Sequence, residues 1–297
     1  MMIPAWAMEA CLDDSCFAAA YEAVSPERRA LMKTAIARLH AWHSPLPAPR
    51  WSCERRWQQG FFSRESVEPM QVCLLLFDAY FASPAKLLAA LMPALSSGVG
   101  TVLAVRTTVE GDLPCPPEVL AALELAGQEN VVELLPEKAR ALFSELARND
   151  VTCAALTFGR TRELVPPGFA DGAARRIWNP EFGDELSVWL EGEDDVDLVA
   201  LSFAHPQAKI IVYGAERELP RGLFQHQEGD FASFLSRLPR AAYAPDKLLN
   251  EVSSSAALAL GPGHEACWIW PALCPDFFLA RRLTWGMLPE NVEREDT

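Results

Sequence analysis

The stretch "QVCLLLFDAYFASPAKLLAALMPALSSGVGTVLAV", residues 71–105, contains one complete strand–helix–strand unit. Residues 71–77 form a short continuous apolar run, which is typical of a strand buried on both faces of a parallel sheet. A serine–proline pair at 83–84 begins a helix, and the glycine-rich residues 98–100 end it before the apolar strand at 101–105. We therefore predict a βαβ unit.

The same alternation of helix and strand repeats along the residues that follow. "PPEVLAALELAG" (116–127) predicts a helix and "NVVELL" (130–135) a strand. "PEKARALFSELARND" (136–150) predicts a second helix and "VTCAALTF" (151–158) a further strand. Four parallel strands with intervening helices indicate a compact Rossmann-like domain, which we place at residues 68–170.

A second αβ set follows, and we expect it to form its own sheet. A helix that begins at Ser25 contributes an apolar stripe, and we expect the N-terminal helices to complete this second unit. Residues 44–60 are expected to be a polar connecting segment. The predicted elements are a helix at 171–178 ("DGAARRIW"), a strand at 186–191, a helix at 196–203, a strand at 209–214 and a buried strand at 256–261.

The fold class predicted from this order of elements is α/β, with two Rossmann-like αβ domains, one inserted in the other, each a three-layer α/β/α arrangement. Residues 1–67 and 171–297 would make up the first, discontinuous domain. Residues 68–170 would make up the inserted domain.

Composition limits the partners. The 297 residues include 26 Lys and Arg against 40 Asp and Glu, a formal net charge of -14 that repels phosphate backbones and anionic membrane surfaces. Nucleic acid and membrane are therefore excluded as expected partners. The eight cysteines form no CxxC pair, the N-terminus lacks a basic leader, and no apolar run is long enough to span a membrane. We expect reduced thiols and a cytoplasmic location.

Local motifs do not establish a chemistry. "GPGHEA" (261–266) matches GxGxxA after a strand, but it lies near the end of the chain rather than in the first βαβ unit. His205 lies between a helix and a strand, where ligands gather in open α/β sheets, although a histidine at a helix end is more often a cap. Asp246 and Lys247 are most simply a solvated pair. Two groups contain residue types that bind metals: His40 with His43, and His264 with Cys267 and Cys274. Neither group fits a zinc template.

Read in order, however, these segments resemble the histidinol dehydrogenase family, whose members have an aldehyde dehydrogenase-like fold and use zinc and NAD. The likeness covers residues 30–285 in collinear order. "YAPDKL" (243–248) resembles the family's YAPEHL motif, and residues 71–105 resemble its first cofactor-domain unit. Further similar segments are "AIARLHAWH", "PPEVLAALELAGQENVVELLPEKARALFSEL", "VPPGFADGAARRIW", "EFGDELSVWLEG", "LVALSFAHPQAKIIVYG" and "LALGPGHEACWIWPALCPDFFL".

The resemblance implies a truncated and divergent member that has lost the family's functional residues. The family's catalytic Glu-His pair falls at Asp246 and Lys247, so an ammonium replaces the general base. The family's substrate histidine falls at Phe277, and its cofactor contacts fall at Leu75, Lys138 and Phe169. Its zinc ligands fall at Ser202, His205 and Trp270, of which only His205 keeps the family's residue type, and one imidazole cannot hold Zn²⁺ by itself. Neither zinc nor NAD is expected.

Three functions remain open. The first is a non-catalytic binding or regulatory protein with an unknown partner, either another protein or a second copy. The second is a divergent NAD(P)-linked oxidoreductase of the same fold that uses other residues, such as His205, Asp246, Lys247, Cys267 or Cys274. The third is a structural subunit of a larger assembly, which predicts an exposed apolar patch and no pocket. An open interdomain cleft lined by the residues named for the second function would favour chemistry, and a cleft plugged by Phe77, Phe169, Trp270 or Phe277 would exclude it.

Overall fold

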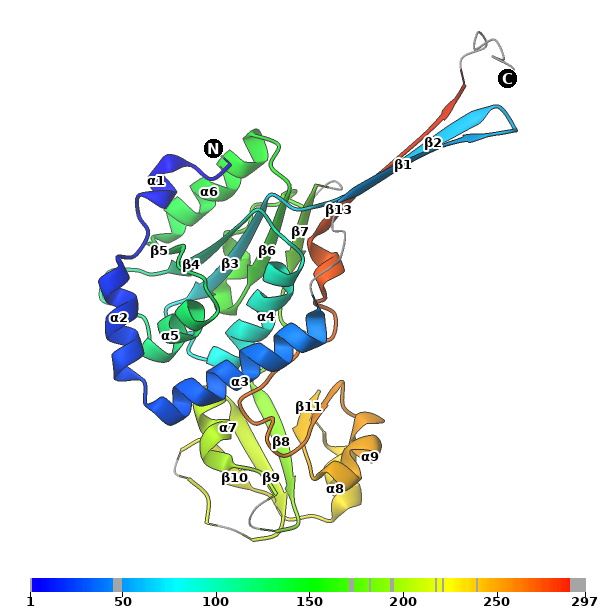
Figure 1. Ribbon diagram of the computed structural model, residues 1–297. Helices are drawn as coiled ribbons and strands as arrows, with labels where there is room; N and C mark the ends of the chain where they lie inside the picture. Colours follow the sequence, from blue (N-terminus) through cyan, green and yellow to red (C-terminus); the bar gives the residue numbers. More distant parts are fainter. Residues whose placement is uncertain are drawn as a thin grey trace.

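The computed structural model describes residues 2–44, 50–170, 174–181, 183–192, 195–216, 218–220, 222–238 and 240–288. Their strands form two five-stranded parallel sheets and one three-stranded antiparallel sheet (Figure 1). The α/β class predicted from the sequence is confirmed.

The first sheet has the strand order β5-β4-β3-β6-β7, with β3 at its centre. Both faces of β3 are covered, because α4 and α5 pack on one side and α6 on the other. This is why the run at 72–77 is fully buried and carries no alternation of polar residues. The strands are β3 (Val72–Asp78), β4 (Thr101–Thr107), β5 (Val131–Leu134), β6 (Cys153–Thr157) and β7 (Arg175–Trp178), and the helices are α4 (Pro84–Ser96), α5 (Pro117–Leu125) and α6 (Pro136–Arg148).

The helix predicted at 171–178 is wrong where the structure describes it. Residues 171–173 lie outside the described part, and β7 occupies the positions from Arg175 to Trp178. β7 pairs in parallel with β6 and buries Trp178, so the ladder that this edge of the sheet offers outweighs the local preference for helix. The first sheet therefore continues beyond residue 170. The domain bounds themselves stay a prediction.

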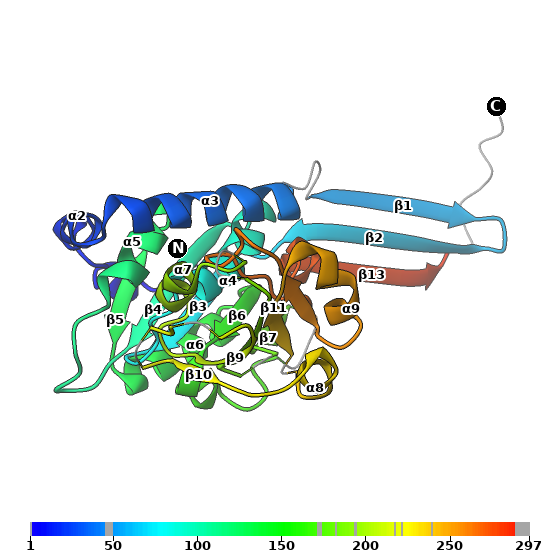
Figure 2. The same cartoon turned by 90° about the horizontal axis from the view of Figure 1, so that it is seen from below.

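The N-terminal helices do not complete the second sheet, contrary to expectation. Helix α2 (Asp14–Ala23) packs against α5, and α3 (Pro26–His43) lies along α4, with a smaller contact to α7 of the second unit (Figure 2). Their buried residues, such as Phe17 and Met32, share one apolar core with Leu88 and Leu91 of α4. Apolar contact with the first sheet's helix layer therefore positions them. Helix α1 (Ala5–Met8) packs on the opposite face, near α6.

The second sheet has the order β10-β9-β8-β11-β12 and lies beside the first unit (Figure 1). Helix α7 covers one face, where its apolar residues join the main core, and α8 with α9 covers the other. The strands are β8 (Glu185–Leu190), β9 (Lys209–Gly214), β10 (Phe224–His226), β11 (Ala241–Tyr243) and β12 (Leu258–Leu260), and the helices are α7 (Leu198–Ala204), α8 (Phe231–Ser236) and α9 (Leu249–Ser253).

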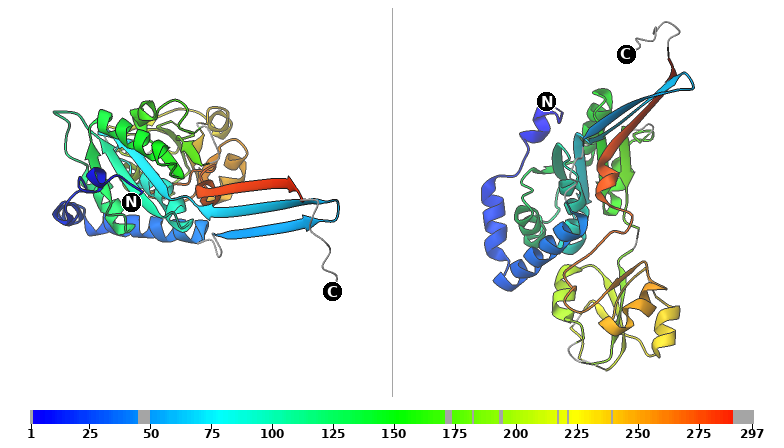
Figure 3. Two further views of the ribbon diagram at one scale, coloured as in Figure 1. Left: turned by 90° about the horizontal axis from the view of Figure 1, so that it is seen from above. Right: turned by 45° about the vertical axis from the view of Figure 1, so that its right-hand side comes forward.

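A two-faced arm projects from the body, which the sequence analysis did not predict. Strands β1 (Trp51–Trp57), β2 (Phe61–Pro69) and β13 (Leu279–Met287) form it as an antiparallel sheet and extend side by side away from the rest of the molecule (Figures 2 and 3). The part of the expected polar connection that the structure describes is thus largely strand. It was missed because β13, which completes the sheet, comes more than 200 residues later in the sequence.

Candidate functional site

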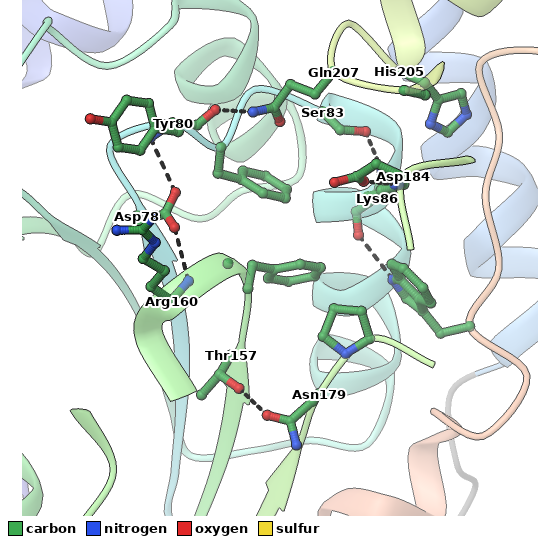
Figure 4. A pocket seen from close by; sticks show the side chains of 16 residues that line it. Asp78, Tyr80, Ser83, Lys86, Thr157, Arg160, Asn179, Asp184, His205 and Gln207 are labelled. Carbon is green, nitrogen blue, oxygen red and sulfur yellow. Dashed lines mark hydrogen bonds and ion pairs between the residues drawn. The ribbon is translucent and has the colours of Figure 1, made fainter. Parts of the chain in front are cut away.

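A cleft of about 550 Å³ lies between the two parallel sheets, at the carboxyl ends of strands of the first sheet (Figure 4). The chain passes from β3 outward to β5 and then returns to add β6 and β7 on the other side of β3. The cleft is outside the point where this direction reverses, which is where ligands bind in open α/β sheets. Its lining combines charged groups, amides, hydroxyls and aromatic faces.

Asp78, the last residue of β3, organises the first-sheet side of the cleft. Its carboxylate accepts hydrogen bonds from the backbone N–H of Tyr80 at 3.1 Å and of Arg160 at 2.9 Å. Gly159 has φ +62° and approaches this carboxylate so closely that a Cβ at this position would collide with it. Glycine at 159 therefore allows the turn after β6 to close onto Asp78.

Thr157 and Asn179 lie at the ends of β6 and β7, on the same side of the cleft. The Thr157 hydroxyl lies 2.5 Å from Asn179 Oδ1 and 3.2 Å from the Trp178 carbonyl, and it donates to these acceptors. The contact fixes the orientation of the Asn179 amide, which is part of the cleft lining.

Gln207 joins the two sides of the cleft. Its Oε1 accepts a hydrogen bond from the backbone N–H of Ala82 at 2.9 Å, and its Nε2 donates to the carbonyl of Tyr80. The turn that follows β3 is thereby tied to the loop after α7.

Lys86 is the one charged residue of the apolar helix α4, and its side chain is 6% exposed. Its Nζ lies 2.5 Å from Asp184 Oδ1 and 5.4 Å from the centre of the Trp268 ring. The Asp184 side chain is 68% exposed, so a buried ammonium is paired with a carboxylate that water reaches freely. Ser83, which caps α4, donates its hydroxyl proton to the Ala204 carbonyl and holds α7 against this site.

His205 follows α7 and forms the inner wall beside Lys86. The residue is 1% exposed, and its Nε2 lies 3.2 Å from the Tyr243 hydroxyl. Burial, and to a lesser extent the nearby Lys86 ammonium, lowers the pKa of His205 well below its ordinary value of 6.5. The imidazole is therefore neutral near pH 7.

The positions that match the family's zinc ligands do not converge. His205 lines the cleft, but the Ser202 hydroxyl donates back to the Val199 carbonyl, and Trp270 donates its indole N–H to the Lys86 carbonyl. Among the described residues no three His, Cys, Asp or Glu side chains are grouped to hold a metal. The indole and the adjacent Lys86 ammonium make this donor set unsuitable for Zn²⁺.

The positions that match the catalytic residues lie away from the cleft lining. Lys247 is exposed and pairs with Glu191 at 2.5 Å, a hydrogen bond that raises the pKa of Lys247. The idea that Lys247 could serve as a desolvated base is therefore wrong. Asp246 lies against Gly261, and Phe277 packs on Phe278.

The positions that match the cofactor contacts are built into the structural framework. Leu75 is fully buried in β3, Phe169 packs edge-on against Phe143 under α6, and the Lys138 ammonium lies over the Trp6 ring. None of the three lines the cleft. These side chains do not fit the role of NAD ligands.

The expected aromatic plug does not form. Phe77 is buried against Phe81, Phe169 lies on the far face of the sheet, and Phe277 is not part of the cleft lining. Trp270 contributes one wall and leaves the cleft open.

The remaining sequence candidates have structural roles. The "GPGHEA" turn is held by Glu265, whose carboxylate accepts from the N–H groups of Gly263 and Asp197. His43 is buried, Cys267 is buried beside Arg38, and Cys274 is exposed outside the cleft.

Sequence reasoning missed Asp78, Thr157, Lys86 and Asp184. Two features of the sequence could have indicated Asp78, Thr157 and Lys86 as site residues. Asp78 and Thr157 end predicted parallel strands, where sites gather, and Lys86 is a lone cation in an otherwise apolar helix. Asp184 precedes its strand and gave no such signal.

No protein-family model matches the chain, and no curated protein matches it. A solved structure of histidinol dehydrogenase from Elizabethkingia anophelis is similar, with a TM-score of 0.57 and 12% identity over 94% of this chain and 77% of that chain. Aldehyde dehydrogenase from Brucella melitensis biovar abortus 2308 has a TM-score of 0.46 and 13% identity over 93% of this chain and 83% of that chain. At 12% identity, the likeness to histidinol dehydrogenase shows the fold alone.

Among the described residues, no helix is both long and apolar enough to cross a membrane.

Proposed function

We propose that this chain is a non-catalytic protein of the histidinol dehydrogenase-like fold that binds a small polar molecule in the cleft between its sheets. The observation that carries the proposal is the separation of the catalytic positions from the cleft. Lys247 pairs with Glu191 on the surface, whereas the cleft retains Asp78, Lys86 and His205.

Chemical reasoning supports binding rather than the family's hydride transfer. That reaction needs a general base close to the substrate, and an exposed ammonium with a raised pKa cannot accept a proton near neutral pH. It also needs a nicotinamide cofactor held beside the substrate, and the matching side chain of Leu75 is enclosed in the sheet. The open, mixed polar and aromatic cleft has the size and lining of a small-molecule site.

The test combines binding with turnover. Isothermal titration of the purified protein with NAD and with histidinol is expected to show no binding, and absorbance at 340 nm no NADH formation. Metal analysis is expected to find no stoichiometric zinc. The double variant Asp246→Glu, Lys247→His restores the family's side chains and is expected to stay inactive, because these positions lie outside the cleft. NAD-dependent oxidation by the wild type would refute the proposal and favour a divergent oxidoreductase.

A second role is favoured by the arm. Alternate residues place Trp51, Trp57, Leu283, Trp285 and Met287 on one face, and the last three are 70–75% exposed. The same face also carries Arg55, Glu65 and Arg281 between these apolar side chains. The opposite face carries ion pairs between Glu54 and Arg64 and between Glu68 and Arg282. An exposed apolar face of this kind is typical of an interaction surface. The assembly-subunit reading predicted such a patch, but its prediction of no pocket is wrong.

We infer that the apolar face of the arm packs against the same face of a second copy. A two-fold arrangement covers the apolar face of each copy with a single contact. Light scattering after gel filtration is expected to give twice the chain mass. Trp285→Lys is expected to give the monomer, and Thr284→Lys, which places the same charge on the opposite face of the same strand, is expected to keep the dimer. A wild-type monomer at micromolar concentration would contradict this inference.

A further inference from the structure

The ligand class can be inferred from two buried groups on the inner wall of the cleft, His205 and Lys86. This inference rests on the proposed binding role of the cleft. The described protein residues leave His205 Nδ1 without a partner and pair Lys86 with a carboxylate that is 68% exposed.

The hydrogen bonds of Tyr243 determine which nitrogen of His205 carries the proton. The Tyr243 hydroxyl donates its one proton to the Cys267 carbonyl at 3.3 Å, so it can only accept from His205 Nε2. The proton of the neutral imidazole is then on Nε2, and Nδ1 carries a lone pair. Nδ1 is buried and has no hydrogen-bond partner among the described residues. It requires a donor, such as a hydroxyl group.

Lys86 requires an anion. Its ammonium is buried, and its acidic partner is the exposed carboxylate of Asp184. Because Asp184 can rotate into water at little cost, a ligand carboxylate can take its place on Lys86 without leaving either charge unsolvated. In the structure Asp184 thus occupies the position that a ligand carboxylate would take.

The rest of the lining suits a chain of hydroxyl groups. Asp78 supplies acceptor oxygens, Asn179 supplies an amide, and Arg160 brings a guanidinium to the cleft. The rings of Trp270 and Phe158, whose centroids are 6.1 Å apart, give an apolar wall for the carbon–hydrogen face of such a chain.

We propose that the cleft binds a small polyhydroxylated carboxylate, with its carboxylate on Lys86 in place of Asp184 and a hydroxyl group donating to His205 Nδ1. Neither interaction involves a covalent step, so the ligand leaves unchanged.

Three six-carbon probes separate the two demands. D-Gluconate has both a carboxylate and hydroxyls, sorbitol lacks the carboxylate, and hexanoate lacks the hydroxyls. Isothermal titration of the full chain is expected to give binding of gluconate at least about tenfold tighter than that of either partial probe. Equal binding of sorbitol or hexanoate would overturn this ligand class while leaving a binding cleft. Failure of all three to bind would also overturn it, and NADH formation from histidinol would in addition overturn the proposed function.

Variants test the assigned contacts in opposite directions. Asp184→Asn removes the competing carboxylate and is expected to tighten gluconate binding by about threefold to tenfold, without affecting sorbitol. Glu185→Gln is the matched control, because it removes the same charge one residue further along, where Glu185 pairs with Lys209. It is expected to change nothing. Weaker gluconate binding in Asp184→Asn would refute the displacement.

His205→Phe removes the buried acceptor and is expected to weaken gluconate binding about tenfold while leaving hexanoate unaffected. Circular dichroism checks that this variant is folded. If it is not folded, the comparison of gluconate with hexanoate on the wild type decides the question. The same circular dichroism check applies to Asp184→Asn, because this variant leaves the buried Lys86 ammonium without its carboxylate partner.

Discussion

Removing the Tyr243 hydroxyl should both destabilise the protein and change the character of its cleft. Tyr243→Phe deletes one atom from a fully buried residue at the end of β11. That atom accepts from His205 Nε2 and donates to the Cys267 carbonyl. The ring of the phenylalanine fills nearly the same volume, so packing is retained and the hydrogen bonds are the main loss.

The size of the effect follows from these two bonds. Each contributes about 1 kcal/mol net, and a buried donor or acceptor left without a partner costs about 1–3 kcal/mol. The two hydrogen bonds are rather long, at 3.2 and 3.3 Å. The expected loss in the free energy of unfolding is therefore in the lower part of the range that these contributions give together. We expect the free energy of unfolding to fall by about 2–3 kcal/mol.

Urea unfolding followed by circular dichroism measures this loss, with Tyr213→Phe as the control. Tyr213 is also buried, on strand β9 of the same sheet, but its hydroxyl makes no hydrogen bond to another described residue. The control is expected to change the free energy of unfolding by less than about 0.5 kcal/mol. Nitrogen-15 shifts of His205 are expected to show the proton on Nε2 in the wild type and partly on Nδ1 in Tyr243→Phe. Equal stability of the two variants, with the His205 proton unmoved, would refute this hydrogen-bond chain.

Other regions give further expectations. Glu133→Gln should lower the free energy of unfolding by about 1–3 kcal/mol in urea, because Glu133 neutralises the 1%-exposed Arg106 at 2.6 Å; an unchanged midpoint would contradict the pairing. Because the folded pKa of His205 is lowered, the unfolded state binds the extra proton below about pH 6.5, so stability should fall as pH decreases from 7 to 5 by at most about 1.4 kcal/mol per unit. His205→Phe should flatten this slope, and a steeper slope would show the sign to be wrong. Lys247→Met should leave gluconate binding unaltered, because the Lys247 ammonium pairs with Glu191 outside the cleft; a clear loss of binding would place it at the site.

Much of the fold could be predicted from short stretches of sequence, because a buried parallel strand and a crossover helix each have a recognisable pattern of residues. The apolar run at 72–77 and the capped helix after it give β3 and α4 without reference to any other segment. β7 was assigned to the wrong element because its pairing with β6, rather than its own residues, determines its conformation. The arm was missed for the same reason, since β1 and β2 are completed by β13 from the other end of the chain.

The candidate site, like the fold, could be predicted from the sequence only in part. His205 was recognised from its place between helix and strand, but its neighbours Lys86 and Asp184 are separated from each other by 98 residues. Only folding brings the ammonium of α4 to the carboxylate before β8. The sequence by itself determined the α/β class and the acidic charge, because these depend on residue types and short-range periodicity. The tertiary structure decided that the cleft is open and that Lys247 lies outside it. It also left His205 Nδ1 buried without a hydrogen-bond partner among the described residues, because burial and hydrogen-bond partners are properties of long-range packing.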